Sequence, residues 1–512
     1  MGDEAVLLDV EGGHRAAQAL ARTIRARDVV PGAGTVGVVG SSRHVEAVGA
    51  GVAVDAGVAV EPERPPVTHQ IPVVVDGEDL AELGLAADEV TRLLAGSELE
   101  VAWLGFMPGF PYLVGLPPEL AALPRRRVPR ARVPAGSLAV GNGYAGIYPG
   151  TSPGGWQLLG HTGVCLFELT PEPRPALRPG DRVHFVPVAV VSAPEPLPRP
   201  PVTGDALEVV DPGPLLLVED GGRADAGHLG VPRAGAANSC FLRIANLAVG
   251  NDEWAPALEL AGAVRLRARR ELLLALAGDA PLVVGGTQLP TGTVAAAGTG
   301  QLIEIGAVRS RARAVLAIAG GVQQAPLFGS YSGDAVSGLP PGPLRAGDVL
   351  DVGGHPERAR VRFSLPPPEV PVRLRAIVGP DEGRAEALVG ARFVVDRQSD
   401  RTGVRLRPAP GATDRTMSAS VRPVPSHAVV PGCIQAPPGG GIVVLGPDCG
   451  PVGGYPVPAT VITADLWRLG TVVPGDEVEI TLVSLESAKV CAERLDTWIA
   501  GAVTGWYPTA FA

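Results

Sequence analysis

One local pattern occurs three times along this chain of 512 residues and limits what it can fold into. The copies read Arg178-Pro-Gly-Asp-Arg-Val-His-Phe, Arg345-Ala-Gly-Asp-Val-Leu-Asp-Val and Val473-Pro-Gly-Asp-Glu-Val-Glu-Ile. In each copy Gly-Asp supplies a turn, and apolar residues at alternate positions give the following strand one buried face. Copies spaced by roughly 130 to 170 residues indicate three β-domains of related build.

The chain contains 68 glycines and 53 prolines, an excess that approaches the composition of disordered proteins. Hydrophobic residues make up 46% of it, which is enough apolar surface to offset the entropy cost of ordering. The sequence therefore predicts a folded protein rich in turns, with about three or four domains.

The charge and the cysteines exclude several classes of protein. The net charge is −10 and no basic block is present, which argues against a nucleic-acid partner. Five widely spaced cysteines without a CxxC motif favour reduced thiols and a cytoplasmic protein. The start of the chain lacks the pattern of a secretion signal. The uncharged stretches Val133 to Phe167 and Ala280 to Ile303 are interrupted by glycine and proline, so no membrane segment is expected.

We expect five segments along the chain. Residues 1–95 form a small α/β domain, residues 96–190 a first barrel, residues 191–204 a proline-rich linker, residues 205–365 a second barrel, and residues 366–512 a third barrel with a C-terminal helix. Hydrophobic periodicity predicts helices at His14–Arg27, Asp88–Leu94 and Leu485–Ile499, and a further helix capped by Asn238. It predicts strands at Val36–Val39 and Ile71–Val75.

Three segments rich in glycine, proline and polar residues contain the candidate ligand-binding side chains. The first, from Gly105 to Gln157, combines rigid turns with side chains that can clamp a carboxylate or orient an amide. The candidates from this segment and its neighbour are Arg130, Ser137, Tyr148, Gln157 and His161. His161 and His228 lie in glycine-rich loops, where a structural histidine is the alternative to a catalytic one.

The second segment runs from Glu219 to Leu260 and supplies Arg223, Arg233 and Asn238 as substrate-binding candidates. Within it, Asn246 and Glu259 lie in apolar surroundings and are interpreted as interior network residues. The third segment supplies Asp400, Arg401, Gln435, Tyr455 and Asp465. Its glycine clusters, Gly439–Gly441 and Gly453-Gly454, suit either a phosphate cradle or hairpin turns. Neither a generic catalytic motif nor a metal-binding motif is present, so no metal is expected.

These segments carry a family resemblance. Gly105-Phe-Met-Pro-Gly-Phe-Pro-Tyr-Leu, Val133-Pro-Ala-Gly-Ser and Ser152-Pro-Gly-Gly-Trp-Gln-Leu resemble the B component of 5-oxoprolinase, also called allophanate hydrolase subunit 1. From Ala206 on, Gly230-Val-Pro-Arg-Ala-Gly, Ser399-Asp-Arg, Gly432-Cys-Ile-Gln and Gly453-Gly-Tyr-Pro resemble the C component, or allophanate hydrolase subunit 2. The resemblance implies a natural fusion of B and C, mainly β, with a small α/β domain and three cyclophilin-like barrels.

The chain also departs from the family pattern, and several departures replace polar residues by apolar ones. They are Asn238 for an aspartate, Tyr331 and Gly333 for arginine and threonine, Thr402-Gly-Val404 for Met-Gly-Tyr, Pro451-Val452 for Thr-Thr, His161 for an arginine, and Leu93 or Leu94 for a histidine. These departures indicate a divergent member and leave its substrate open.

The resemblance implies an ATP-dependent amidohydrolase that opens 5-oxoproline to glutamate together with a separate large A-type subunit or lactam-utilisation protein. ATP is the implied cofactor, bound by this chain or its partner. Opening an amide requires a stabilised oxyanion and a proton for the departing nitrogen. Arg401 and the other candidate arginines, Arg130, Arg223 and Arg233, suit the first task, and Asp400 and Asp465 suit the second.

Two other functions stay open. The same pair of components resembles the carboxyltransferase portion of biotin-dependent urea carboxylase. The only lysine, Lys489, does not lie in a biotin-attachment motif, so biotin would be carried by another chain. Some relatives of the B part resemble inhibitors of histidine kinases, which suggests a regulator without catalysis. The oligomeric state is likewise left open, a homo-oligomer included.

Overall fold

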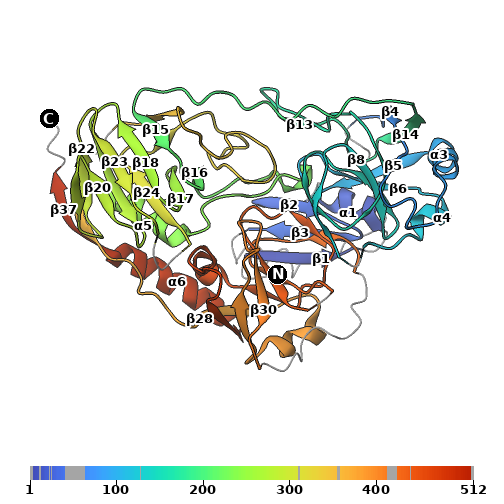
Figure 1. Cartoon of the computed structure of the whole chain (residues 1–512). Helices are drawn as coiled ribbons and strands as arrows, with labels where there is room; N and C mark the ends of the chain where they lie inside the picture. The colour runs from blue at the N-terminus through green and yellow to red at the C-terminus, as the bar shows by residue number, and fades with distance from the viewer. Residues whose placement is uncertain are drawn as a thin grey trace.

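The computed structural model describes residues 4–10, 13–21, 24, 26–40, 64–126, 128–308, 312–354, 358–411, 424–438 and 440–508. Most of its regular structure is β. Figure 1 shows three β-rich bodies, with the sheet of the N-terminal residues lying between two of them. We call this sheet and its helix the N-terminal unit, and the three bodies the first, second and third β-domains in chain order. The expected mainly β fold with a small α/β unit is confirmed.

The N-terminal unit is a three-stranded antiparallel sheet with one helix. Its strands are β1 (Ala5–Asp9), β2 (Asp28–Pro31) and β3 (Thr35–Val39), in the order β1-β3-β2. The helix α1 (Gly13–Ala21) ends before the expected Arg27, and part of the intervening stretch lies outside the described residues. Arg15 on α1 donates to Glu100 of the first β-domain at 2.5 and 3.2 Å, which ties the unit to that domain.

The first β-domain is a seven-stranded sheet in the order β11-β8-β9-β6-β5-β14-β4. Its two edge strands meet, because the N–H and C=O groups of Val74 and His161 exchange hydrogen bonds of 2.9 Å. The strands are β4 (Thr68–Val73), β5 (Leu99–Leu104), β6 (Pro111–Val114), β8 (Ser137–Gly141), β9 (Tyr144–Ile147), β11 (Gln157–His161) and β14 (Arg182–Pro187). The sheet thus curls around one core.

The boundary expected at residue 95 lies inside this domain rather than before it. Strand β4 pairs in parallel with β14, and the helix α3 (Ala87–Ala95) packs on β14 through the same core. A parallel partner more than 100 residues away leaves no local signal in the sequence, so the pattern around Ile71 could not assign the strand to its sheet.

The second β-domain consists of two sheets packed around a large apolar core. One has the order β21-β20-β23-β18-β15-β26-β25 and the other β16-β17-β24-β19-β22. Their strands are β15 (Leu207–Asp211), β16 (Leu215–Glu219), β17 (Ala257–Ala261), β18 (Val264–Ala268), β19 (Leu272–Ala277), β20 (Leu282–Val284), β21 (Thr287–Leu289), β22 (Val294–Ala297), β23 (Leu302–Ile305), β24 (Ala314–Ile318), β25 (Val322–Gln323) and β26 (Val349–Val352).

The helix α5 (Ser239–Val249) packs against the five-stranded sheet. Asn238 caps it as predicted, because its side chain accepts a 3.0 Å hydrogen bond from the N–H of Phe241. The proline-rich residues 191–204 form neither helix nor strand, and in Figure 1 this stretch crosses from the first to the second β-domain.

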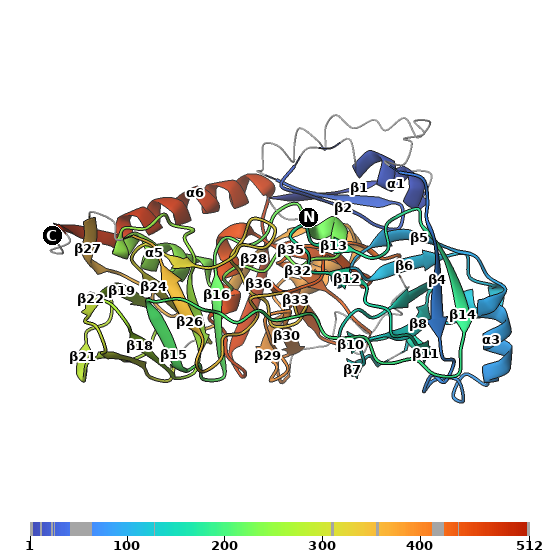
Figure 2. The ribbon, with the colours of Figure 1, turned by 90° about the horizontal axis from the view of Figure 1, so that it is seen from above.

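The third β-domain is a closed barrel in the order β28-β35-β32-β33-β30-β29-β36. Its strands are β28 (Val372–Val378), β29 (Arg392–Val395), β30 (Gly403–Pro408), β32 (Cys433–Gln435), β33 (Ile442–Leu445), β35 (Ala459–Val461) and β36 (Glu477–Leu482). The helix α6 (Leu485–Ala502) then runs along the outside of the molecule (Figure 2). It delivers β37 (Val503–Pro508) to β27 (Arg358–Phe363) beside the second β-domain.

Short elements complete the described fold. They are α4 (Pro118–Ala121), the paired strands β7 (Arg130–Val133) and β10 (Ser152–Gly154), β12 (Phe167–Glu168) and β13 (Arg174–Pro175), β31 (His427–Ala428) and β34 (Val452–Gly453), and the 3-10 turns η1 (Gly227–Leu229), η2 (Glu382–Leu388) and η3 (Thr463–Gly470). All five cysteines are free thiols, and no described helix is long and apolar enough to cross a membrane.

The repeated Gly-Asp pattern forms the same turn in each β-domain. The glycines Gly180, Gly347 and Gly475 have φ values of 91°, 91° and 99°, a region that favours glycine. Each following aspartate accepts from the N–H three residues earlier, at 3.0 Å for Asp181, 2.7 Å for Asp348 and 2.9 Å for Asp476. The turn then leads into the strand that the pattern predicted.

The turn in the first β-domain generates a prediction. Asp181 is buried, which opposes its ionisation, but Arg64 at 2.7 Å and the N–H groups of Val67 and Arg178 outweigh burial and lower its pKa. We expect Asp181→Asn to reduce the free energy of unfolding at pH 7 by about 2 kcal/mol. Because the folded pKa is lowered, this advantage of the wild type is present above about pH 4 and is lost as the pH falls further.

Urea denaturation followed between pH 7 and pH 3 measures this difference. Asp205→Asn serves as the control, because Asp205 is exposed and its ion-pair partner in the described part of the chain, Arg270, lies 3.8 Å away. A difference between wild type and Asp181→Asn that stays constant over this pH range would contradict the assignment.

Candidate functional site

A cavity of about 430 Å³ lies where the second and third β-domains meet the N-terminal unit. Its walls come from Asp220–Ala224 and Arg233–Ala237 of the second domain, and from residues around Arg401 and Gly446 of the third. Glu4 and Arg27 of the N-terminal unit line it as well. A concave site with converging charged groups is the default location for ligand binding in a protein of this size.

The floor of the cavity is formed by Arg401, which is the centre of a buried group of charges. This guanidinium donates to both oxygens of Asp448 at 2.8 Å, to Glu259, and to the carbonyl of Gly235 at 2.8 Å. Glu219 lies 3.0 Å from it. Burial alone would lower the pKa of Arg401, but the three carboxylates outweigh burial and raise it well above its ordinary value.

Glu219 differs from the other two carboxylates in this group. It is fully buried, and neither of its oxygens accepts a hydrogen bond within the described part of the chain. Burial raises the pKa of Glu219 well above its usual range, and Glu259 and Asp448 raise it further against the opposing effect of Arg401. With Glu219 protonated, two carboxylates would face Arg401 and the nearby Arg313, and the charges of the buried group would balance.

The arginines that line the cavity differ in how fully they are paired. Arg223 donates through its two terminal nitrogens to Asp334 at 3.2 Å and to the carbonyls of Pro232 and Ser332. Among the described residues, Arg313 forms an ion pair with Glu259 at 3.6 Å. The Arg233 side chain forms neither a hydrogen bond nor an ion pair with any described residue.

Burial lowers the pKa of both Arg233 and Arg313. The nearby carboxylates, Glu259 for Arg313 and Glu4 and Asp28 for Arg233, only partly offset this effect of burial. A largely buried cation that is incompletely paired is costly unless an anion accompanies it. The cavity therefore suits a small anionic ligand.

Asp400 lies at the exposed edge of the cavity. Its Oδ1 accepts from the N–H groups of Thr402 at 2.8 Å and Gly403 at 3.1 Å, which fixes the side chain in a tight turn. This carboxylate is available to exchange a proton with a ligand, because its Oδ2 has no hydrogen-bond partner among the described residues.

Of the predicted residues, the structure thus brings Arg223, Arg233, Asp400 and Arg401 to one cavity. Asn238 is buried beside it as the helix cap. Asp465 lies outside it and is engaged by Arg375 at 2.6 to 2.9 Å and by Arg468 at 3.1 Å. Its predicted acid–base role stays a prediction, which these pairings do not favour.

The candidates of the first β-domain lie away from the cavity and contact other parts of that domain. Arg130 pairs with the buried Asp79 at 2.6 Å, Gln157 donates to the carbonyl of Pro124, and Ser137 to that of Pro134. Tyr148 is buried, which raises its pKa, and His161 faces Asp76 at 2.9 Å. Their substrate-binding role stays a prediction as well.

Gln435 and Tyr455 lie outside the cavity, in the third β-domain near its contact with the first. There Arg125 donates to the carbonyl of Gly454 at 3.2 Å and to the hydroxyl of Ser426 at 2.9 Å. The Gln435 amide lies against Gly453 of the same barrel. Gly454 therefore takes part in this contact and Gly453 packs within the barrel, while Gly439 of the suggested phosphate cradle lies outside the described residues.

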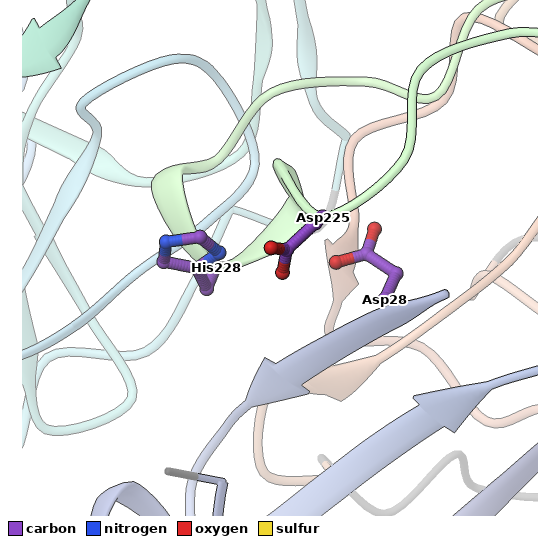
Figure 3. Close-up of side chains that lie close together, drawn as sticks. All are labelled: Asp28, Asp225 and His228. Carbon is purple, nitrogen blue, oxygen red and sulfur yellow. The ribbon is translucent and has the colours of Figure 1, made fainter. Parts of the chain in front are cut away.

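Sequence reasoning missed Glu4, Arg27 and Arg313, which line the cavity without belonging to any recognisable motif. It did identify Glu259 as an interior network residue, as found here. It also missed a group formed by Asp28, Asp225 and His228, whose ligand atoms lie within 4.8 Å of one another (Figure 3). This donor set is chemically able to hold a divalent cation, although Asp28 already accepts from the Gly227 N–H at 3.2 Å.

Comparison with known proteins gives two family matches. The family "carboxyltransferase domain, subdomain C and D" matches residues 1–177, and "carboxyltransferase domain, subdomain A and B" matches residues 229–482. The crystal structure of the protein TTHA0988 is 35% identical, with a TM-score of 0.79 over 93% of this chain and all of the other. The chain is therefore a carboxyltransferase-domain protein.

Similar curated proteins refine this class. The B component of 5-oxoprolinase from Escherichia coli O157:H7 is 47% identical over 136 residues, 25% of this chain and 61% of that protein. The C component from Escherichia coli K12 is 31% identical over 300 residues, 55% of this chain and 93% of that protein. Urea amidolyase of Saccharomyces cerevisiae is 29% identical over 57% of this chain, but only 17% of that protein is covered.

The chain belongs to the 5-oxoprolinase family of B and C components and is a fusion of a B-like half with a C-like half. We use B-like half for the N-terminal unit with the first β-domain, and C-like half for the second and third β-domains. The cavity lies in the C-like half, with a wall contributed by the B-like half. The family resemblance expected from the motifs is confirmed.

The charge balance of the cavity floor can be tested by two matched substitutions. Asp448→Asn removes a carboxylate that chelates Arg401, and we expect it to reduce the free energy of unfolding by about 3 kcal/mol. Glu219→Gln has the shape of a protonated glutamate, so we expect a loss of about 1 kcal/mol or less. Urea denaturation at pH 7 measures both, and equal losses would show that Glu219 is ionised.

Proposed function

We propose that this chain is the fused B and C component of a complex that hydrolyses a carbon–nitrogen bond of a cyclic amide, with 5-oxoproline as substrate. The observation that carries the proposal is the cavity with two largely buried, incompletely paired arginines, Arg233 and Arg313. 5-Oxoproline carries one carboxylate, the group that a guanidinium binds best. Similarity of both halves to components of 5-oxoprolinase supports this choice.

The chemistry assigns separate tasks to the groups around the cavity. Water adds to the lactam carbonyl carbon, the ring C–N bond breaks, and the departing nitrogen takes a proton to give glutamate. Arg313 would stabilise the negative charge that develops on the carbonyl oxygen. Asp400 would move the proton at the cavity edge. ATP would supply the free energy for carbonyl activation and is cleaved to ADP and phosphate.

The proposal also includes a separate large subunit as the partner of this chain. The names of the relatives, which are lettered B and C, support an assembly with at least one further chain. We assign the binding of ATP to that large A-type subunit, so the present chain supplies the cavity for the lactam.

A second candidate function is carboxyl transfer from biotin. It is favoured by the carboxyltransferase family matches and by the similarity to urea amidolyase. The anionic carboxyl group of carboxybiotin would also suit the arginines. The biotin would come from another chain, because Lys489 lies on α6 beside Glu486 and outside the cavity. Turnover that depends on a biotinylated partner and is blocked by avidin would favour this alternative.

The proposed reaction predicts ATP-dependent formation of glutamate from 5-oxoproline when the chain is mixed with the large subunit. We expect Asp400→Asn to lower kcat about 100-fold with a smaller change in KM, because the general acid–base group is lost. Asp396→Asn is the matched control, because Asp396 lies on the same stretch, pairs with Arg407 at 2.6 Å and does not line the cavity.

Glutamate release measured in a coupled assay distinguishes the outcomes. Wild-type rates for both variants would remove Asp400 from the reaction. An absence of ATP-dependent glutamate with a competent large subunit would refute the lactam as substrate.

A further inference from the structure

Arg233 lies on a loop of the C-like half that residues of the B-like half hold in place. The N–H of Asp225 donates to the carbonyl of Arg27 at 2.8 Å. The N–H of Gly227 donates to both carboxylate oxygens of Asp28 at 3.2 Å. Figure 3 shows Asp28, at the start of β2, pointing toward Asp225 on this loop. The loop that supplies Arg233 is thus attached to the N-terminal unit at two successive points.

The first β-domain holds the same loop from another direction. The N–H of Gly109 donates to the carbonyl of Leu229 at 2.9 Å. Gly230 has a φ of 80°, and a Cβ there would lie 2.1 Å from the carbonyl oxygen of Met107. Two backbones in direct contact leave no room for a side chain, so the glycine-rich stretch after Gly105 serves to dock this loop.

The third β-domain holds the far end of the loop. The N–H of Ala234 donates to the carbonyl of Pro447 at 2.9 Å, and the carbonyl of Arg233 accepts from the N–H of Arg223 at 2.7 Å. The backbone on either side of the Arg233 side chain is therefore fixed, while its guanidinium has no partner among the described residues. A fixed cation that faces a cavity is preorganised for an anion.

The neighbouring cation of the B-like half is neutralised instead. Arg27 lines the same cavity and pairs with Glu4 at 3.0 Å. Two adjacent guanidiniums repel each other, and the Glu4 carboxylate offsets this for Arg27. Glu4 and Asp28 also attract the Arg233 guanidinium, but neither forms a hydrogen bond or an ion pair with it. Arg233 is left as the cation with unused hydrogen-bonding capacity on this side of the cavity.

We propose that the anion-binding site is shared by the two halves: Arg233 binds the carboxylate of a small organic anion, and Asp28 of the B-like half positions the loop that supplies it. The inference deepens the proposed function and rests on it for the choice of cavity. It gives the B-like half a role in ligand binding rather than in catalysis. Asp28 acts here as a hydrogen-bond acceptor and is a positioning residue.

Isothermal titration calorimetry of the full chain tests the Arg233 part. The probes are 5-oxoproline, the neutral lactam 2-pyrrolidinone, and glutarate, a dicarboxylate without an amide. We expect Arg233→Gln to weaken binding of the two anions by about 30-fold and to leave 2-pyrrolidinone within about twofold. The control Arg265→Gln changes an exposed arginine of β18 and should alter no affinity.

The proposal is overturned if Arg233→Gln binds the two anions with affinities within about twofold of wild type. It is also overturned if the wild-type chain binds neither carboxylate probe at about 10 mM. Arg233-dependent binding of glutarate without turnover of 5-oxoproline in the complex would keep the shared anion site and reject the lactam. The two proposals therefore fail separately.

A second pair of variants tests the contribution of the B-like half. Asn at position 28 keeps an acceptor oxygen for the Gly227 N–H and Ala does not, so we expect Asp28→Ala to weaken anion binding about tenfold and Asp28→Asn to retain it. Unchanged affinity for 2-pyrrolidinone and an unchanged circular dichroism spectrum separate loop positioning from misfolding. Wild-type anion affinity of Asp28→Ala, or an equal loss in Asp28→Asn, overturns the positioning role.

Discussion

The arrangement of the C-like half depends on one buried guanidinium. Arg401 begins in the third β-domain and ends between Glu219 and Glu259, which lie on adjacent strands of the second. Moving Arg401 away from these carboxylates would leave unpaired charges in a buried environment, which is costly. The two domains therefore cannot separate or rotate freely. The same contact forms the cavity floor. Domain packing and site geometry therefore have a common cause.

The B-like half is joined to this assembly by apolar packing and also by close contacts between backbones. The carbonyl of Phe106 would lie 2.2 Å from a Cβ at Gly450, much as the carbonyl of Met107 would at Gly230. Glycines at such positions allow two main chains to touch and to satisfy each other's polar groups. The glycine excess of the sequence is thus used for contact between domains as well as for turns. As one consequence, the loop that supplies Arg233 is held by the N-terminal unit, the first β-domain and the third β-domain.

The sequence predicted what local signals control. The three Gly-Asp turns, the cap at Asn238 and the C-terminal helix all depend on neighbours a few residues away, and the structure has them where the pattern placed them. Strand β4 could not be assigned, because its parallel partner is β14. Among the predicted site residues, Arg130 and Arg233 are the same residue type in similar Pro-Arg settings. Only the fold shows that Asp79 pairs with the first and that the second faces a cavity.

These arginines differ in how they are paired, and their local sequence motifs do not reveal this difference. Arg130, Arg223 and Arg401 each have carboxylates at hydrogen-bond distance, and such arginines hold the fold together. Arg233 has none among the described residues, although its burial costs free energy. A folded protein keeps such a group when binding repays that cost in the complex. The cation without a hydrogen-bonded partner among the described residues thus identifies the wall of the cavity at which we propose that an anion binds, and the two halves of the chain meet at that wall.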